Sequence, residues 1–219
     1  MTPKATGLLD ALKLLALVAM TVDHVNTALL DRTCEVMTLI GRIAFPVFVV
    51  AAAFGALRTR APARYLRRLF LCAAAAQLFF WLALGGPWWY LNTVFTLLWG
   101  VAAVLALRFR RYWLVPLLVL PAVVSDYAIA GATAVFAGAL LLSGSPMVKV
   151  LGGLVFLALG PLLWSTPAYR IVGFAACGAA LLLWTYASGR TSPAGARYGF
   201  YVFYPLHLAV LAGLRQLLL

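Results

Sequence analysis

Charged residues are scarce in this chain of 219 residues, and acidic residues are the scarcest. Only 10% of the residues are charged, and Asp and Glu together number 5. Soluble domains carry about 25% charged residues. Hydrophobic residues reach 65% here, with a mean hydropathy of +1.02. These values exclude an ordinary water-soluble domain and predict a polytopic membrane protein.

Cysteine is also rare, and the recognised nucleotide and metal motifs are missing. Cys34, Cys72 and Cys177 form no CxxC pair and no Cys/His ligand spacing, so we expect packing residues or free thiols, with no metal. The absence of a P-loop, a GxGxxG and an HExxH argues against nucleotide hydrolysis and zinc proteolysis. Without an internal repeat or a long linker, we expect a single domain over residues 1–219, and no segment predicts an oligomeric state.

The 17 Lys and Arg residues give a net charge of +12. They alternate with long apolar runs and do not form one patch or tail, which argues against a nucleic-acid partner. Two groups, at 58–68 and 108–111, are typical of cytosolic loops. Counting basic residues on each side of the predicted spans places the amino terminus in the cytosol.

The apolar runs predict an all-α transmembrane helical bundle of about nine spans (eight to ten), embedded in membrane lipid. We expect no cleaved signal, because the first run is too long and no small-residue cleavage site follows it. The predicted spans are 8–30, 38–57, 69–84, 91–107, two within 112–142, 148–163, 171–186 and 198–214.

The run 112–142 is too long for one span. A single helix there would be about 46 Å long, well beyond the hydrocarbon core. We therefore predict two short spans that turn near Ser125, Asp126 and Tyr127. The alternative, a single span, would move all later loops to the opposite side of the membrane.

Four ionisable residues lie within the first predicted span: Asp10, Lys13, Asp23 and His24. Charges at such depth are expensive unless they face a partner or a wet cavity, so their default interpretation is functional. Helical spacing places Asp10, Lys13 and His24 near one face. Asp23 points about 100° away and is expected to meet another helix.

His24 is a candidate general base or acyl carrier, because imidazole titrates near neutral pH. A hydrogen-bonded core histidine is the alternative. Arg42, in the next span, could pair with Asp23 or Asp126, or could stabilise the oxyanion of an acyl-transfer intermediate. These three residues, His24, Asp23 and Arg42, are the candidate catalytic group.

A second set comprises candidates for substrate binding, each with a structural alternative. His207 lies in the last span, three residues after Tyr204, in an aromatic stretch that could equally be core packing. Asp126 and Tyr127 lie at a predicted turn, and Asn92 could simply start a helix.

The arginines in the loop at 58–68 have two interpretations. They are ordinary topology determinants, or Arg64, Arg67 and Arg68 bind the phosphates of a cytosolic cofactor, since guanidinium groups suit phosphate oxygens.

Five sequence blocks occur in an order similar to that of the TraX family, whose founding member is the conjugative F-pilin N-acetylase. The blocks are LKLLALVAMTVDHV, GRIAFPVFVV, NTVFTLLWG, SDYAIAG and RYGFYVFYPLHL. The DxxK motif, followed eleven residues later by His24, also resembles the DGLR…H pattern of the wider transmembrane acyltransferases. Lys13 stands where an arginine is usual, which keeps the charge but loses the bidentate fork.

The resemblance implies a multi-pass enzyme of the bacterial inner membrane. It would take acetyl from cytosolic acetyl-CoA and pass it to an acceptor on the outer side, either a pilin-like amino terminus or a glycan hydroxyl. His24 would be the motif histidine, with Lys13 and Asp10 near the donor. Asp23, Arg42, Asn92, Asp126 and His207 match family motif positions.

Two other classes remain open at this stage. Buried Asp, Lys and His residues also build proton relays, so a small proton-coupled transporter is one rival. The other is a non-catalytic assembly factor for pili or an envelope polymer. Binding of CoA would distinguish the enzyme from both.

Overall fold

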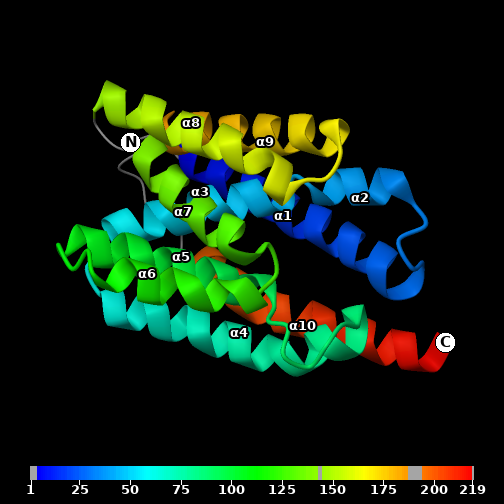
Figure 1. Ribbon diagram of the computed structural model, residues 1–219. Helices are drawn as coiled ribbons and strands as arrows, with labels where there is room; N and C mark the ends of the chain where they lie inside the picture. Colours follow the sequence, from blue (N-terminus) through cyan, green and yellow to red (C-terminus); the bar gives the residue numbers. More distant parts are fainter. Residues whose placement is uncertain (1–3, 143–144, 187–193, 219) are drawn as a thin grey trace.

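The computed structural model describes the backbone of residues 4–142, 145–186 and 194–218, and the side chains of residues 11–142, 145–183 and 199–218. The described residues are almost entirely helical, which confirms the predicted all-α class (Figure 1). The helices are α1 (Lys4–Leu29), α2 (Glu35–Gly41), α3 (Ala44–Arg58), α4 (Pro62–Leu84), α5 (Thr93–Arg108), α6 (Leu114–Val119), the 3₁₀ helix η1 (Leu120–Val124), α7 (Ala128–Leu141), α8 (Pro146–Leu163), α9 (Pro167–Tyr186) and α10 (Ala194–Leu218).

The surface has the character of a membrane protein. Leu14, Leu71 and Leu154 are each more than half exposed, and many other large apolar side chains also face outward. Within the described residues, five apolar segments reach 18 residues or more and four others are shorter. Those nine segments correspond to the nine predicted spans, although three of them, α5, Leu114–Val124 and α7, lack the length of a full crossing.

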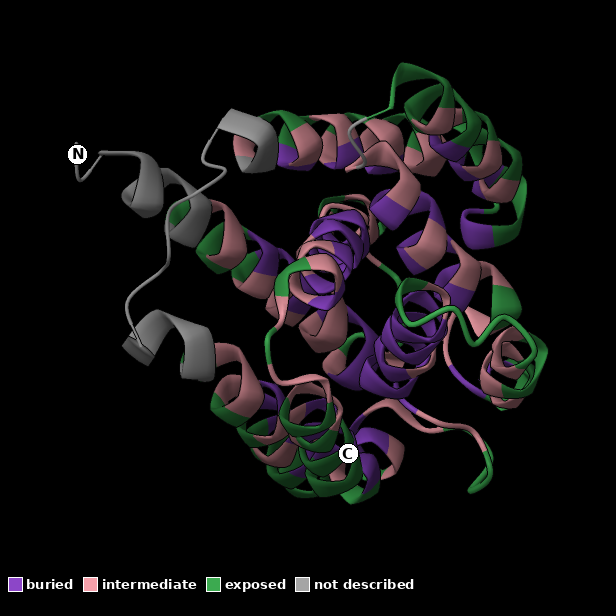
Figure 2. Ribbon diagram, turned by 90° about the vertical axis from the view of Figure 1, so that its left-hand side faces the viewer, coloured by how far each residue is buried: buried purple, intermediate pink, exposed green. Residues whose placement is uncertain are grey.

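The helices lie side by side, with α3, α5 and α7 packed against one another (Figure 1). Buried residues concentrate in the middle of the bundle (Figure 2). On α5, burial is nearly continuous from Val94 to Ala106. The last helix, α10, packs against both α4 and α1. The carboxy-terminal end of the chain is thereby brought beside the first helix.

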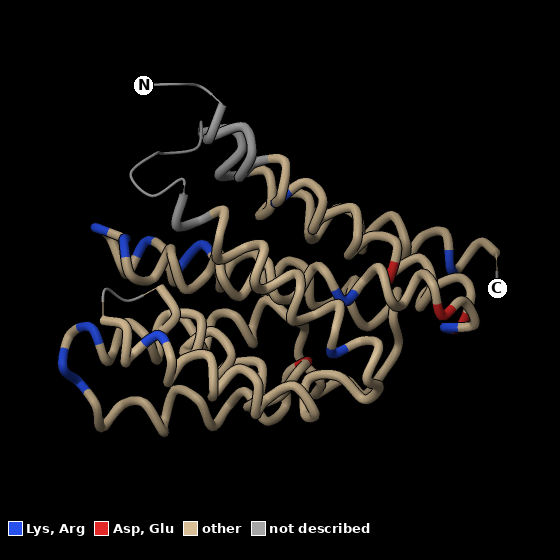
Figure 3. The backbone as a smooth tube through the Cα atoms, turned by 90° about the horizontal axis from the view of Figure 1, so that it is seen from above, with Lys and Arg blue, Asp and Glu red and all other residues tan. Residues whose placement is uncertain are grey.

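The two ends of the bundle differ in charge (Figure 3). The Nη1 atom of Arg108, at the end of α5, donates to the carbonyl oxygens of Ala56 and Thr59 at 3.0 and 2.9 Å. This contact brings the two basic loops together at one end, as the sequence predicted. An isolated parallel bridge between Leu91 and Ser125 joins two other connections.

The predicted turn within 112–142 is confirmed. One apolar segment, Leu114–Val124, is followed by α7, and the chain reverses between them. The single-span alternative is wrong, because this turn is fixed on both sides. The Leu91 backbone N–H donates to the Val124 carbonyl at 2.8 Å, and the Asp126 N–H donates to the Leu91 carbonyl at 2.9 Å.

The second predicted span is interrupted between α2 and α3. Pro46 has no N–H to donate to the Arg42 carbonyl, and its ring crowds that carbonyl, which favours a kink or break at this point. The chain forms i→i−3 hydrogen bonds here instead, as in a 3₁₀ turn. The N–H groups of Arg42 and Ile43 donate to the carbonyl oxygens of Leu39 and Ile40 at 3.2 and 3.1 Å. The helical segment also begins at Glu35, earlier than the predicted residue 38.

Candidate active site

The two histidines of the chain meet in the structure. Nδ1 of His24, on α1, lies 2.8 Å from Nε2 of His207, on α10, and the planes of the two rings are nearly parallel, at an angle of 10°. His207 is 7% exposed and packs face to face with the Phe203 ring at 5.2 Å. The packing of α10 against α1 therefore creates a histidine pair from residues 183 positions apart.

The hydrogen bonds of His207 fix the proton positions in this pair. Nδ1 of His207 lies 3.1 Å from the Phe203 carbonyl oxygen, which only accepts, so this nitrogen carries the proton. Nε2 of a neutral His207 is then an acceptor, and Nδ1 of His24 donates to it. The tautomer of His24 that results keeps a lone pair on Nε2. Within the described part of the chain, no hydrogen bond occupies that nitrogen.

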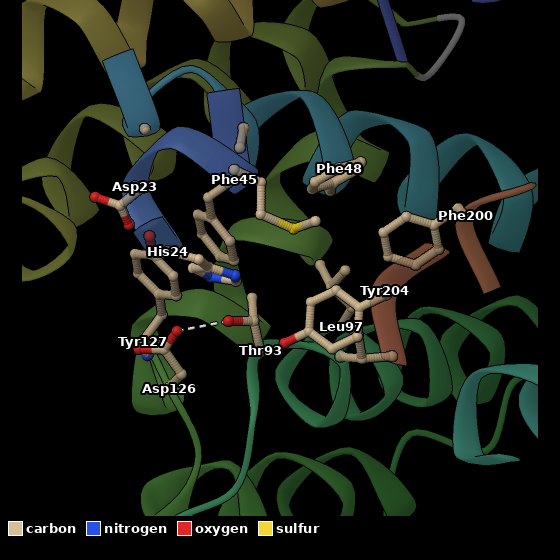
Figure 4. A pocket seen from close by; sticks show the side chains of 14 residues that line it. Asp23, His24, Phe45, Phe48, Thr93, Leu97, Asp126, Tyr127, Phe200 and Tyr204 are labelled. Carbon is tan, nitrogen blue, oxygen red and sulfur yellow. Dashed lines mark hydrogen bonds between the residues drawn. The ribbon is translucent and has the colours of Figure 1, made fainter. Parts of the chain in front are cut away.

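His24 lies on the wall of a partly open cavity of about 50 Å³ (Figure 4). Residues from α1, α2, α3, α5, α10 and the turn before α7 form this wall. The polar members are Asp23, His24, Thr93, Asp126, Tyr127 and Tyr204, and the larger apolar members include Met20, Phe45, Phe48, Leu97 and Phe200.

Asp23 meets a residue of another helix, as predicted. Its Oδ1 accepts from Nη2 of Arg42 at 2.8 Å, and both side chains are largely shielded, with exposures of 21% and 16%. Nε of Arg42 donates to the Thr38 carbonyl at 3.0 Å. Arg42 lies behind Asp23 and outside the cavity wall. The guanidinium therefore neutralises Asp23 and ties α1 to the break between α2 and α3.

Two small details of packing allow that ion pair. A Cβ placed on Gly41 would lie 2.4 Å from the Asp23 Cβ, so only glycine lets α2 approach α1 this closely. Asn26, fully buried on α1, donates to the Cys34 carbonyl at 2.8 Å and to the Thr38 hydroxyl at 2.9 Å. Asn26 thus anchors the start of α2 on α1.

The carboxylate of Asp126 lies across the cavity, and among the described residues its hydrogen-bond donors are all neutral groups. Thr93 Oγ1 donates to Oδ2 at 2.5 Å, while the Tyr90 hydroxyl and the Tyr127 N–H donate to Oδ1 at 3.3 and 3.1 Å. The Thr96 hydroxyl also donates to the Asp126 carbonyl. These bonds fix the turn before α7 against the start of α5.

Tyr127 has a strained backbone beside the cavity. Its φ of 61° lies in the left-handed region, and the next residue, Ala128, has a φ of 45°. Such conformations cost about 1 kcal/mol or more for residues with a Cβ, and they cluster at functional sites. The Tyr127 ring stacks on Phe45 with centroids 3.8 Å apart. The strain thus places an aromatic ring on the cavity wall.

Asn92 occupies a structural position. It is fully buried and caps α5, accepting from the Val94 N–H at 3.0 Å. Its amide nitrogen donates to Gln77 Oε1 and to the Ala73 carbonyl, each at 2.8 Å. Asn92 does not line the cavity. The geometry favours the helix-start interpretation.

The predicted cofactor-binding residues lie away from the cavity. Lys13 is half-buried on α1, about 16 Å along the helix from His24. Arg64 and Arg67 are exposed near the start of α4, and Arg68 is half-buried beside them. The side chain of Asp10 lies outside the described residues.

Sequence reasoning did not single out Thr93, Asn26 or Gln77. Each is a polar residue inside an apolar helix or at its start, and that position alone could have marked it as a candidate. Thr93 proves to be on the cavity wall, and the other two fix neighbouring segments. Which partner each would find depends on packing between helices, which the pattern does not contain.

An apolar helical bundle whose ionisable side chains converge on one cavity defines a polytopic membrane protein with a candidate active site. A family model described as TraX protein matches residues 8–215, so the chain belongs to the TraX family. This membership associates the chain with the pilin-linked function that its sequence motifs implied. Searches of curated proteins and of solved structures gave no match.

Proposed function

We propose that this protein is a membrane-embedded acetyltransferase. It takes an acetyl group from cytosolic acetyl-CoA and passes it to an acceptor at the periplasmic side of the bacterial inner membrane. The acceptor is a pilin-like amino terminus or a glycan hydroxyl. Membership in the TraX family supports the reaction class.

The observation that carries the proposal is the histidine pair at the cavity. His207 holds the His24 ring so that Nε2 keeps its lone pair. A base fixed in one tautomer by a second group is the arrangement that nucleophilic and general-base catalysis requires. The orienting group here is a neutral imidazole, in the place where other sites use a carboxylate.

Two routes use the same nitrogen. In direct transfer, His24 Nε2 takes the proton of the acceptor amine or hydroxyl as it attacks the thioester carbonyl, and the C–S bond breaks to release CoA. In the relay, Nε2 itself attacks that carbonyl, and the C–S bond breaks to release CoA as a thiolate. The acetylated ring passes its Nδ1 proton to His207 Nε2. The acceptor then attacks the acetyl-histidine, the C–N bond to the ring breaks, His207 returns the proton to Nδ1, and the proton of the acceptor neutralises the thiolate.

The size of the cavity supports transfer of a small group. About 10–15 Å³ is the minimum that holds one water molecule, so a cavity of about 50 Å³ has room for a small group but not for a large one. An acetyl group has three heavy atoms. In this proposal the acetyl group enters, while the nucleotide part of CoA stays near the basic end, where Arg64, Arg67 and Arg68 lie.

The test uses purified protein in lipid nanodiscs with radiolabelled acetyl-CoA. Release of free thiol and label transfer are measured with two acceptors, a short peptide with a free amino terminus and an oligosaccharide. We expect wild type to transfer label to one of them and His24→Ala to lose at least about 100-fold in rate. Wild-type turnover by His24→Ala would refute the proposal.

A rapid-quench measurement separates the two routes. Protein mixed with labelled acetyl-CoA and quenched within the first turnover carries label on His24 in the relay. In direct transfer it carries none before the acceptor is added.

A further inference from the structure

The hydroxyl of Tyr204 is a buried polar group that makes no hydrogen bond of normal geometry in the described part of the chain, although the Thr93 side chain lies close to it. Tyr204 lies on α10, one turn before His207, and is 2% exposed. Its ring centroid lies 6.4 Å from that of His24. Leaving a buried hydroxyl unpaired destabilises the fold, so such a group in a native structure calls for an explanation.

The close-up view shows where this hydroxyl points. The His24 ring and the Tyr204 hydroxyl are both directed toward Thr93, from opposite walls of the cavity (Figure 4). A small group in the cavity would therefore have the His24 ring on one side and a phenolic O–H on the other.

Two neighbouring donors are already used. The single hydroxyl proton of Thr93 is donated to Asp126, at 2.5 Å, so Thr93 offers the cavity only an acceptor. The guanidinium of Arg42 binds Asp23 and the Thr38 carbonyl and lies outside the cavity wall. The sequence had suggested Arg42 for the oxyanion, but the structure engages it elsewhere.

We propose that Tyr204 is a catalytic residue whose hydroxyl donates a hydrogen bond to the acyl oxygen as it becomes an oxyanion. This inference rests on the proposed acetyl transfer. When the lone pair of the attacking group forms its bond to the carbonyl carbon, the C=O π electrons move to the oxygen. The phenol keeps its proton and stabilises that charge until the C–S bond breaks. Preorganised donors of this kind act most strongly in a dry site.

The same inference explains why no protein group among the described residues is positioned as a hydrogen-bond partner for this hydroxyl. A donor with a partner inside the protein would have to break that bond when the charge develops. A donor held without a partner pays its penalty during folding and is available in the transition state.

The test is Tyr204→Phe, with Tyr65→Phe as the control. Tyr65 is a tyrosine on α4 whose hydroxyl donates to the Ala52 carbonyl at 3.4 Å, away from the cavity. For Tyr204→Phe we expect a fall in kcat of about 100-fold, a KM for acetyl-CoA close to that of wild type, and an unchanged or higher thermal midpoint. The control keeps the wild-type kcat.

A kcat for Tyr204→Phe within about threefold of wild type overturns the inference, and the acetyltransferase proposal survives if His24→Ala is still inactive. A wild-type protein that transfers no acetyl overturns both. If Tyr204→Phe does not fold, fluorotyrosines placed at position 204 give the answer. We expect kcat to change with the acidity of the phenol along the series, and a constant kcat refutes the role.

Discussion

Replacing His207 by phenylalanine tests the histidine pair directly. The phenyl ring, although somewhat larger, keeps an aromatic side chain that can stack on Phe203, but it removes both nitrogens. Nδ1 of His24 then loses the acceptor that lies 2.8 Å away. The variant therefore separates the hydrogen bond from the packing of α10 against α1.

The expected magnitude follows from the charge that develops on His24. When Nε2 gains a proton or an acetyl group, the ring becomes cationic, and its Nδ1–H donates a charge-assisted hydrogen bond to His207. Bonds to charged groups contribute about 1.5–3 kcal/mol. At about 1.4 kcal/mol per factor of ten, losing this bond should lower kcat by about 10- to 150-fold. The KM for acetyl-CoA should change little.

The assay is thiol release and label transfer from acetyl-CoA in nanodiscs, with His207→Gln as the matched comparison. The amide oxygen of glutamine accepts a hydrogen bond, so His207→Gln should recover part of the rate that His207→Phe loses. If His207→Phe retains the wild-type kcat while His24→Ala is inactive, the ring at position 207 only packs and the reasoning fails.

Two further predictions concern the surroundings of the site. Gly41→Val places a side chain where a Cβ would already lie 2.4 Å from the Asp23 Cβ, so we expect a lower thermal midpoint and strongly reduced turnover. Gly153→Val is the control, because its Cβ would meet only Leu141 Cδ2 at 3.8 Å, and equal effects of the two variants would contradict the argument. Replacing the exposed Arg64 and Arg67 together by glutamine should raise the KM for acetyl-CoA several-fold at low salt, with kcat unchanged. A KM equal to that of wild type would leave these arginines as topology determinants.

Much of the fold could be predicted because the membrane restricts it so strongly. An apolar run has to be a helix, and its length has to suit the bilayer. The turn at residues 125–127 followed from this argument alone, since 112–142 exceeds one crossing. The break before α3 was not predicted, although Pro46 marks it in the sequence.

The sequence predicted which residues belong to the site better than it predicted which of them contact one another. Helical geometry turned Asp23 away from His24, and Asp23 indeed pairs with Arg42 on another segment. Pairing of His24 with His207 could not be derived, because it depends on α10 closing the bundle against α1. The role of Arg42 likewise depended on the position of the guanidinium relative to a cavity that no sequence pattern describes.

The irregular backbone and the cavity have a common cause. An apolar bundle satisfies its backbone hydrogen bonds within helices, so each interruption exposes polar groups that need other partners. Three interruptions lie around the cavity: the break at Arg42, the start of α5 at Asn92 and the left-handed turn at Tyr127. The side chains that satisfy these interruptions are themselves polar, and they bring charge and hydroxyl groups into an apolar interior. A continuous helix at any one of the three points would remove the side-chain arrangement that the proposed chemistry uses. We therefore expect these strained and broken segments to support the catalytic site.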